Sequence, residues 1–141
     1  MSTYKHILVP TDFSAASKQA AAKALELSRT FDARITLMHV VDYLPPTFIA
    51  QQSEYTSAAQ IVERATAYLG EWAKEVGLDK AEQLVVSGSA GREIRSAAQE
   101  KGVDLIAIGT VGQGGVSRLL GSTTRSVMHD APCDLLSIRC E

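Results

Sequence analysis

Glycines and hydroxyl residues cluster in one stretch of the chain, directly after an apolar run at residues 105–108. The stretch contains Gly109, Gly112, Gly114 and Gly115, and then Gly121, Ser122, Thr123 and Thr124. This order predicts a strand, a glycine-rich loop and the start of a helix. Glycines let backbone N–H groups approach a ligand, and a helix N-terminus carries roughly half a positive charge. The pattern is typical of a phosphate-binding loop, although glycines that serve only a tight connection would also produce it.

A carboxylate, Asp12, follows another short apolar run near the start of the chain. At the end of a strand it would accept a hydrogen bond from the exocyclic amine of a base or from a ribose hydroxyl. Val40 and Ile108, each near the end of an apolar run, would offer apolar walls to a flat base. Adenine satisfies this combination. The alternative for Asp12 is a plain helix N-cap, and that role is equally natural for Ser122 and Thr123.

Motifs of several enzyme classes are missing from the sequence. It has no Gly-x-x-x-x-Gly-Lys-Ser/Thr, no Gly-x-Ser-x-Gly, and no Gly-x-Gly-x-x-Gly after the first apolar run. His39 lies within an apolar run, and we interpret it as a satisfied core histidine rather than a base. Cys133 and Cys140 offer neither a disulfide framework nor a metal-binding spacing. We therefore expect a binding protein without catalytic residues or metal ligands of its own.

Hydrophobic periodicity predicts five strands and four helices. The strands are expected at residues 6–10, 33–41, 82–87, 105–108 and 133–139. The helices are expected at about residues 14–31, 58–76 and 93–101, and from a start between 117 and 122 to a stop before Pro132. Trp72, Val127 and Met128 are expected to point inward, and Gly77 to end the second helix in a left-handed conformation. Residues 42–53 are expected to form a long loop.

Strands that alternate with helices call for right-handed crossovers and a parallel sheet covered on both faces. We therefore predict one α/β domain, residues 1–141, built as a doubly wound three-layer sandwich. In such sheets ligands bind outside the carboxyl ends of the strands, where the strand order reverses. If the first and fourth strands are neighbours, Asp12 and the glycine-rich loop face the same crevice.

Composition narrows the classes of partner. The 141 residues are 45% hydrophobic and 21% charged, with a formal net charge of -2 at pH 7. This balance favours neither nucleic acid nor an anionic membrane as a partner. The apolar run before Pro10 has only three residues, 7–9, too few for the core of a signal sequence, and no run approaches the roughly 18 apolar residues of a membrane span. We expect a cytoplasmic protein with small-molecule or protein partners.

Four segments, spread over nearly the whole chain, carry a family resemblance. They are Lys-His-Ile-Leu-Val-Pro-Thr-Asp-Phe-Ser from residue 5, Leu-Met-His-Val-Val-Asp from residue 37, Gly-Thr-Val-Gly-Gln-Gly-Gly-Val-Ser-Arg-Leu-Leu-Gly-Ser-Thr-Thr from residue 109, and His-Asp-Ala-Pro-Cys-Asp-Leu-Leu-Ser-Ile-Arg from residue 129. Taken singly, each segment is only weakly specific for a family. Together and in this order, they resemble the universal stress protein family.

The resemblance implies a five-stranded parallel sheet in the order 3-2-1-4-5 and a homodimer formed by antiparallel pairing of the last strand, from Cys133 to Arg139. ATP-binding members carry Gly-x-x-Gly, then nine residues, then Gly-Ser/Thr. Gly109 and Gly112 match the first pair and Gly121 matches the second, but only eight residues, 113–120, separate them here. A branch of the family that lacks the glycines does not bind ATP.

Carried over by position, the resemblance assigns three groups of site residues. Pro10, Thr11 and Asp12 would hold adenine and ribose, with Val40 lining the base. Ile108 and Gly109 would pass behind the ribose and the α-phosphate. Gly112, Gly121, Ser122 and Thr123 would donate to the remaining phosphates, on which Mg²⁺ is a candidate ion.

Three functions fit these observations. The first is a dimeric stress protein that binds ATP, ADP or AMP and acts as a signalling or protective module on an unidentified protein partner. The second is a slow ATPase or self-phosphorylating protein in which Asp12 doubles as the catalyst. The third is a dimeric interaction module of the same fold that binds no nucleotide, for which the short loop would be the decisive defect.

Overall fold

The computed structural model describes residues 3–42, 58–111 and 122–140, which form five strands and four helices. The strands are β1 (His6–Pro10), β2 (Arg34–Asp42), β3 (Glu82–Gly88), β4 (Leu105–Val111) and β5 (Asp134–Cys140). The helices are α1 (Ala15–Phe31), α3 (Ala58–Glu75), α4 (Ala90–Glu100) and α5 (Ser122–His129). Strands and helices alternate along the chain, as predicted.

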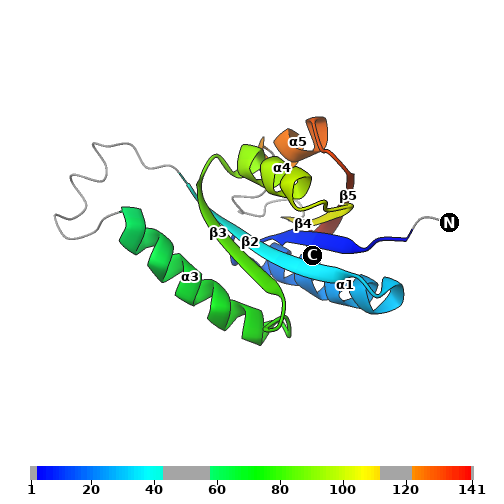
Figure 1. The fold of residues 1–141 in the computed structure, drawn as a ribbon, viewed down its shortest axis with the longest axis horizontal. Helices are drawn as coiled ribbons and strands as arrows, with labels where there is room; N and C mark the ends of the chain where they lie inside the picture. Colours follow the sequence, from blue (N-terminus) through cyan, green and yellow to red (C-terminus); the bar gives the residue numbers. More distant parts are fainter. Residues whose placement is uncertain (1–2, 43–57, 112–121, 141) are drawn as a thin grey trace.

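The strands form one parallel sheet in the order β3-β2-β1-β4-β5, which confirms the predicted α/β architecture. Helices α1 and α3 cover one face of the sheet, and α4 and α5 cover the other (Figure 1). Central strand β1 is fully buried, and its side chains alternate between the two faces. Ile7 and Val9 join the core under α1 and α3, whereas Leu8 joins the core under α4 and α5.

Local sequence signals explain several helix ends. Ser14 is the N-cap of α1, and its hydroxyl accepts a hydrogen bond from the Ser17 N–H. Gly77 follows α3 with a φ of 78°, the left-handed conformation predicted for it. Trp72 on α3 is buried in the core, also as predicted. No helix in the described part of the chain is both long and apolar enough to cross a membrane.

Three predicted details of the elements are wrong. Strand β4 does not end at Ile108 but continues to Val111, because the ladder with β5 pairs Gly109 with Ile138. Helix α4 begins at Ala90 rather than residue 93, so its first turn includes Gly91. Met128 is 58% exposed instead of inward, because the buried face of α5 passes through Thr124 and Val127.

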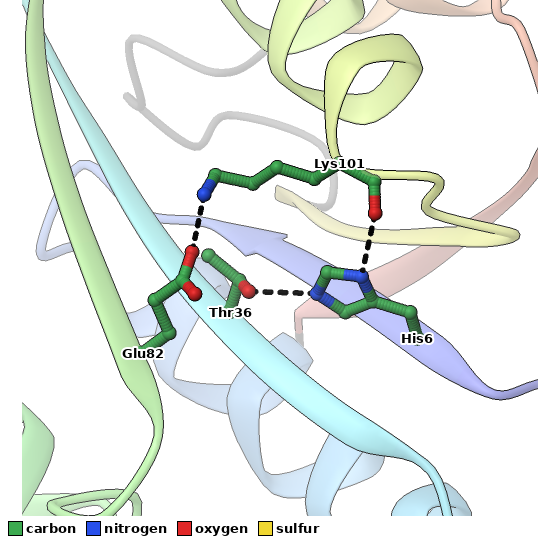
Figure 2. A network of polar contacts seen from close by, with 4 residues as sticks. All are labelled: His6, Thr36, Glu82 and Lys101. Atoms are coloured by element: carbon green, nitrogen blue, oxygen red, sulfur yellow. Dashed lines mark hydrogen bonds and ion pairs between the residues drawn. The ribbon is translucent and has the colours of Figure 1, made fainter.

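A partly buried polar network lies at the end of the sheet at which β1 begins (Figure 2). The His6 ring, 3% exposed, has Nδ1 3.2 Å from the Lys101 carbonyl oxygen and Nε2 2.7 Å from the Thr36 hydroxyl. These partners assign a neutral ring that donates from Nδ1 and accepts at Nε2. Burial, with the nearby Arg34 charge, lowers the pKa of His6. The Lys101 ammonium in turn pairs with Glu82, so the network connects β1, β2, β3 and the end of α4.

Candidate functional site

The carboxyl ends of β1, β2 and β4 lie at one edge of the sheet, because these strands are parallel neighbours. The strand order reverses between β1 and β4, since β2 and β3 extend the sheet on one side of β1 and β5 extends it beyond β4. The neighbouring placement of the first and fourth strands, on which the predicted crevice depends, is therefore present.

Six of the ten predicted site residues lie in or beside these strand ends. Pro10 ends β1 and is followed by Thr11 and Asp12, Val40 lies in β2, and Ile108 and Gly109 lie in β4. Ser122 and Thr123 are the first two residues of α5, which runs from the carboxyl end of β4 back to the start of the parallel β5. Gly112 and Gly121, with the loop between them, lie outside the described residues.

Thr11 anchors the turn between β1 and α1. The residue is 3% exposed, and its backbone N–H donates to the Met38 carbonyl oxygen of β2 at 2.8 Å. Its hydroxyl lies 2.8 Å from the Ser17 hydroxyl and accepts a hydrogen bond from the Phe13 N–H at 2.9 Å. Both the backbone and the side chain of Thr11 are therefore committed to holding this turn in place.

Asp12 forms part of the same turn. Its Oδ1 accepts a hydrogen bond from the Ser14 N–H at 3.0 Å and lies 3.3 Å from the Ser17 hydroxyl. A bond to the N–H two residues ahead is an Asx turn, and Ser14, not Asp12, is the N-cap of α1. An ionised carboxylate has about four acceptor positions, so these bonds are compatible with a further donor from a ligand.

Phe13 adopts a left-handed backbone conformation with a φ of 67°. Its ring lies 4.5 Å from the His39 ring, centroid to centroid, at an angle of 34°. The Phe13 ring also packs edge to face against Tyr68 and Trp72, with ring centroids 4.6 Å and 6.0 Å away. Three aromatic side chains from β2 and α3 thus surround the residue that follows Asp12.

Gly109 has a packing role that the sequence did not indicate. A Cβ atom at this position would lie 2.2 Å from the Ala16 carbonyl oxygen and 2.9 Å from the Ser17 backbone nitrogen. Such contacts are far inside van der Waals distance, so only glycine lets the first turn of α1 approach β4 this closely. Close helix packing accounts for Gly109 whether or not a phosphate binds nearby.

The two predicted apolar walls differ in their exposure. Val40 is half-buried and packs against the core under α4 and α5. Ile108 is fully buried, so its side chain lies inside the protein and the prediction of an apolar surface wall from it is wrong. The residue occupies an interior position of β4.

Helix α5 is held by contacts from α4. The Arg95 guanidinium donates from one nitrogen to the Ser126 carbonyl oxygen at 2.6 Å and to its hydroxyl at 2.7 Å. A Cβ atom on Gly91 would lie 2.3 Å from that same hydroxyl, so the two helices meet at a position where only glycine fits. Because Ser126 lies in the last turn of α5, Arg95 also places a positive charge beside the negative end of the helix dipole.

Sequence reasoning missed several residues that shape this edge. Arg95 binds atoms of another helix, a contact that becomes predictable only when the helix packing is known. Ser17 binds Thr11, Asp12 and Ser14 of the preceding turn, and these contacts depend on the conformation of that turn. The left-handed Phe13 has no sequence signal, because aromatic residues disfavour that conformation. His39 is satisfied by a hydrogen bond, as predicted, but its Nδ1 binds the Thr11 carbonyl oxygen at 2.8 Å and the residue is only half-buried.

Metal ligands and reactive thiols are two further kinds of functional group to consider among the described residues. In the described ranges no group of three or more His, Cys, Asp or Glu side chains could hold a metal ion. Cys133 is a free, half-buried thiol, and burial raises its pKa, which disfavours the reactive thiolate at neutral pH.

Comparison with known families identifies the fold. A model of the universal stress protein family matches residues 3–139. The chain belongs to this family. Universal stress protein A homolog 2 of Coxiella burnetii is 35% identical, in an alignment that covers 99% of this chain and 97% of the relative.

Two solved universal stress proteins share the architecture. UspA from Lactobacillus plantarum matches with a TM-score of 0.76 and 28% identity, over 99% of this chain and 100% of that protein. A universal stress protein solved in complex with cAMP matches with a TM-score of 0.63 and 25% identity, over 97% of this chain and 98% of that protein. The five-stranded order found here is thus that of a universal stress protein.

Proposed function

We propose that this universal stress protein binds an adenine nucleotide, ATP, ADP or AMP, at the sheet edge between β1 and β4. The protein would act as a cytoplasmic, dimeric signalling or protective module through a protein partner. Its nucleotide state would alter the surface that the partner meets.

The observation that carries this proposal is the position of Asp12 and Gly109 beside the point where the strand order reverses. Ligands of doubly wound sheets bind in this position. Asp12 would accept from the nucleoside, Val40 would contact the base, and the backbone at Ile108 and Gly109 would run behind the ribose. The cAMP complex of a universal stress protein supports adenine as the base.

The phosphates would bind to the glycine-rich segment and the first turn of α5. Gly112 and Gly121 would admit them close to the backbone, and Ser122 and Thr123 would donate hydrogen bonds at the positive end of the helix dipole. Mg²⁺ would accompany the phosphates, which are its usual ligands in nucleotide sites.

Titration calorimetry of the purified protein with ATP, ADP and AMP tests the proposal. We expect binding in the micromolar range or tighter, lost in the Gly112→Val and Gly121→Val variants. Gly70→Ala, on α3, is the matched control, because a Cβ there meets nothing closer than 3.7 Å and binding should be unchanged. Failure of the wild-type protein to bind any of the three nucleotides would refute the proposal.

The proposed dimer would form through the edge strand β5, by antiparallel pairing of residues Cys133 to Arg139. An edge strand presents unpaired N–H and C=O groups that a second copy can satisfy. Sedimentation equilibrium should give twice the mass of the chain, and a monomer at micromolar concentration would contradict this part of the proposal. A dimer without nucleotide affinity would instead favour the interaction module without a ligand.

Slow ATP hydrolysis or self-phosphorylation is the remaining alternative, with Asp12 as the candidate catalyst. Prolonged incubation with ATP and Mg²⁺, followed by measurement of ADP and of protein mass, tests it. If the protein only binds the nucleotide, neither ADP nor phosphorylated protein would form.

A further inference from the structure

We propose that His39 is a positioning residue for the nucleoside half of this site, which holds Asp12 in place mainly through a hydrogen bond to its neighbour Thr11, supported by a ring contact with its other neighbour, Phe13. The inference rests on the proposed function. His39 was expected to be only part of the core. The inference gives it a role in setting the geometry of the ligand-binding turn.

The first contact of His39 is with Thr11. Its Nδ1 lies 2.8 Å from the Thr11 carbonyl oxygen, to which it donates a hydrogen bond. The neighbouring β2 residue, Met38, accepts from the Thr11 N–H at 2.8 Å. Two consecutive residues of β2 therefore hold both backbone polar groups of Thr11, just where the chain leaves β1.

The second contact of His39 is with Phe13. The two ring centroids lie 4.5 Å apart and the ring planes are tilted by 34°, so the rings are within the contact distance of aromatic pairs. The left-handed backbone of Phe13 is unfavourable for a residue with a side chain, so it persists only where surrounding contacts enforce it. His39 supplies one of these contacts, and Tyr68 and Trp72 supply the others.

Asp12 is the residue between these two contacts. A carboxylate that must meet a ribose hydroxyl or a base amine has to be held to within a fraction of an ångström. With Thr11 fixed by a hydrogen bond and Phe13 by its ring, Asp12 has little freedom to move. His39 touches both neighbours, so it acts on the ligand through Asp12 and needs no contact with the ligand.

Two substitutions separate the hydrogen bond from the ring contact. His39→Phe keeps an aromatic ring against Phe13 but removes the donor to Thr11. His39→Asn removes the ring but keeps a nitrogen at the δ position, as many bonds from Cα as Nδ1. If the hydrogen bond positions the turn, the asparagine variant should retain most of the ligand affinity and the phenylalanine variant should not.

The experiment titrates adenosine and ATP into the wild-type protein and both variants. We expect His39→Phe to weaken both ligands by the same factor, about tenfold, as loss of one hydrogen bond to a buried carbonyl can produce. His39→Asn should stay within about threefold of wild type. Equal affinities of His39→Phe and wild type, weakening for ATP alone, or equal losses in both variants would overturn the inference and leave the proposed function standing.

A ligand-free measurement separates this inference from the proposed function. The Phe13 and Ser14 amides donate to Thr11 Oγ1 and Asp12 Oδ1, so their hydrogen exchange reports the order of the turn. We expect faster exchange in His39→Phe than in His39→Asn, and unchanged exchange would overturn the inference. Absence of binding by the wild-type protein would instead refute the proposed function. Should His39→Phe fail to fold, a tenfold loss in His39→Asn would still overturn the inference.

Discussion

The left-handed backbone of Phe13 costs roughly 1–2 kcal/mol for a residue with a Cβ atom, whereas glycine adopts it freely. The neighbouring rings must offset this cost, and they do so from β2 and α3. Sequence reasoning had no access to this feature, because the phenylalanine follows a good turn residue and precedes a good cap without any sign of strain.

Replacement of Phe13 by glycine and by alanine should reveal the strain. Both changes remove the ring, but only alanine keeps the unfavourable backbone, so we expect Phe13→Gly to be about 1 kcal/mol more stable than Phe13→Ala. Urea denaturation measures the difference. At Thr66, an exposed position within α3, the same pair should show the usual order, with alanine more stable by about 1 kcal/mol. A Phe13→Ala variant at least as stable as Phe13→Gly would contradict this explanation.

At the scale of elements, the close approach of α1 to β4 depends on the absence of a side chain at Gly109. Gly109 was predicted from the sequence as a ligand-loop glycine, and the strand that contains it was recognised from its apolar run. Its contact with Ala16 joins residues more than ninety positions apart, and no local pattern predicts which helix crosses which strand. Gly109 therefore has a structural role in helix packing in addition to its proposed role in nucleotide binding.

Gly109→Ala should destabilise the protein by about 3 kcal/mol, because backbone atoms of α1 cannot move aside as a flexible side chain would. Gly70→Ala is the matched control: its added Cβ meets nothing closer than 3.7 Å, and alanine is favoured within a helix by about 0.5–1 kcal/mol. Chemical denaturation of both variants gives the comparison. A Gly109→Ala protein within 1 kcal/mol of wild type would show that α1 can shift.

Prediction of the elements succeeded where burial is strong and failed where it depends on tertiary contacts. The runs that form β1, β2 and β4 are apolar because both faces of the sheet are covered, and Ser14 and Gly77 mark helix ends by local chemistry. The phase of the short helix α5 is poorly determined by its sequence, so Met128 was placed on the wrong face. The hydrogen bonds of Ser17 could not be predicted, because they require the finished turn.

For the whole molecule, the His6 network joins four elements at the end of the sheet opposite the candidate site (Figure 2). The charged groups of Arg34, Glu82 and Asp104 act on its neutral imidazole. Burial lowers the pKa of His6 in the folded state below its ordinary value of 6.5. Between these two pKa values the unfolded chain binds more protons than the folded protein, so stability must fall as the pH falls.

We therefore expect the free energy of unfolding to be constant with respect to His6 above pH 6.5 and to decline as the pH drops below it, down to the folded-state pKa. Urea denaturation between pH 5 and 8, for wild type and His6→Gln, measures the difference in slope. Glu82 should not confuse the result, because its pKa is lowered by Lys101 from 4.5 and its contribution is lost only below that pH. Parallel pH profiles of the two proteins would contradict the role given to His6.

The contact between Arg95 and Ser126 has a consequence for how the protein opens. A helix of eight residues is too short to persist alone in water, so α5 depends on its neighbours for its existence. The hydrogen bonds between Arg95 and Ser126 hold α5 against α4, and the two helices pack closely because Gly91 has no side chain. The two helices should then come away from the sheet together, as a single cooperative unit whose local unfolding requires less free energy than unfolding of the whole protein.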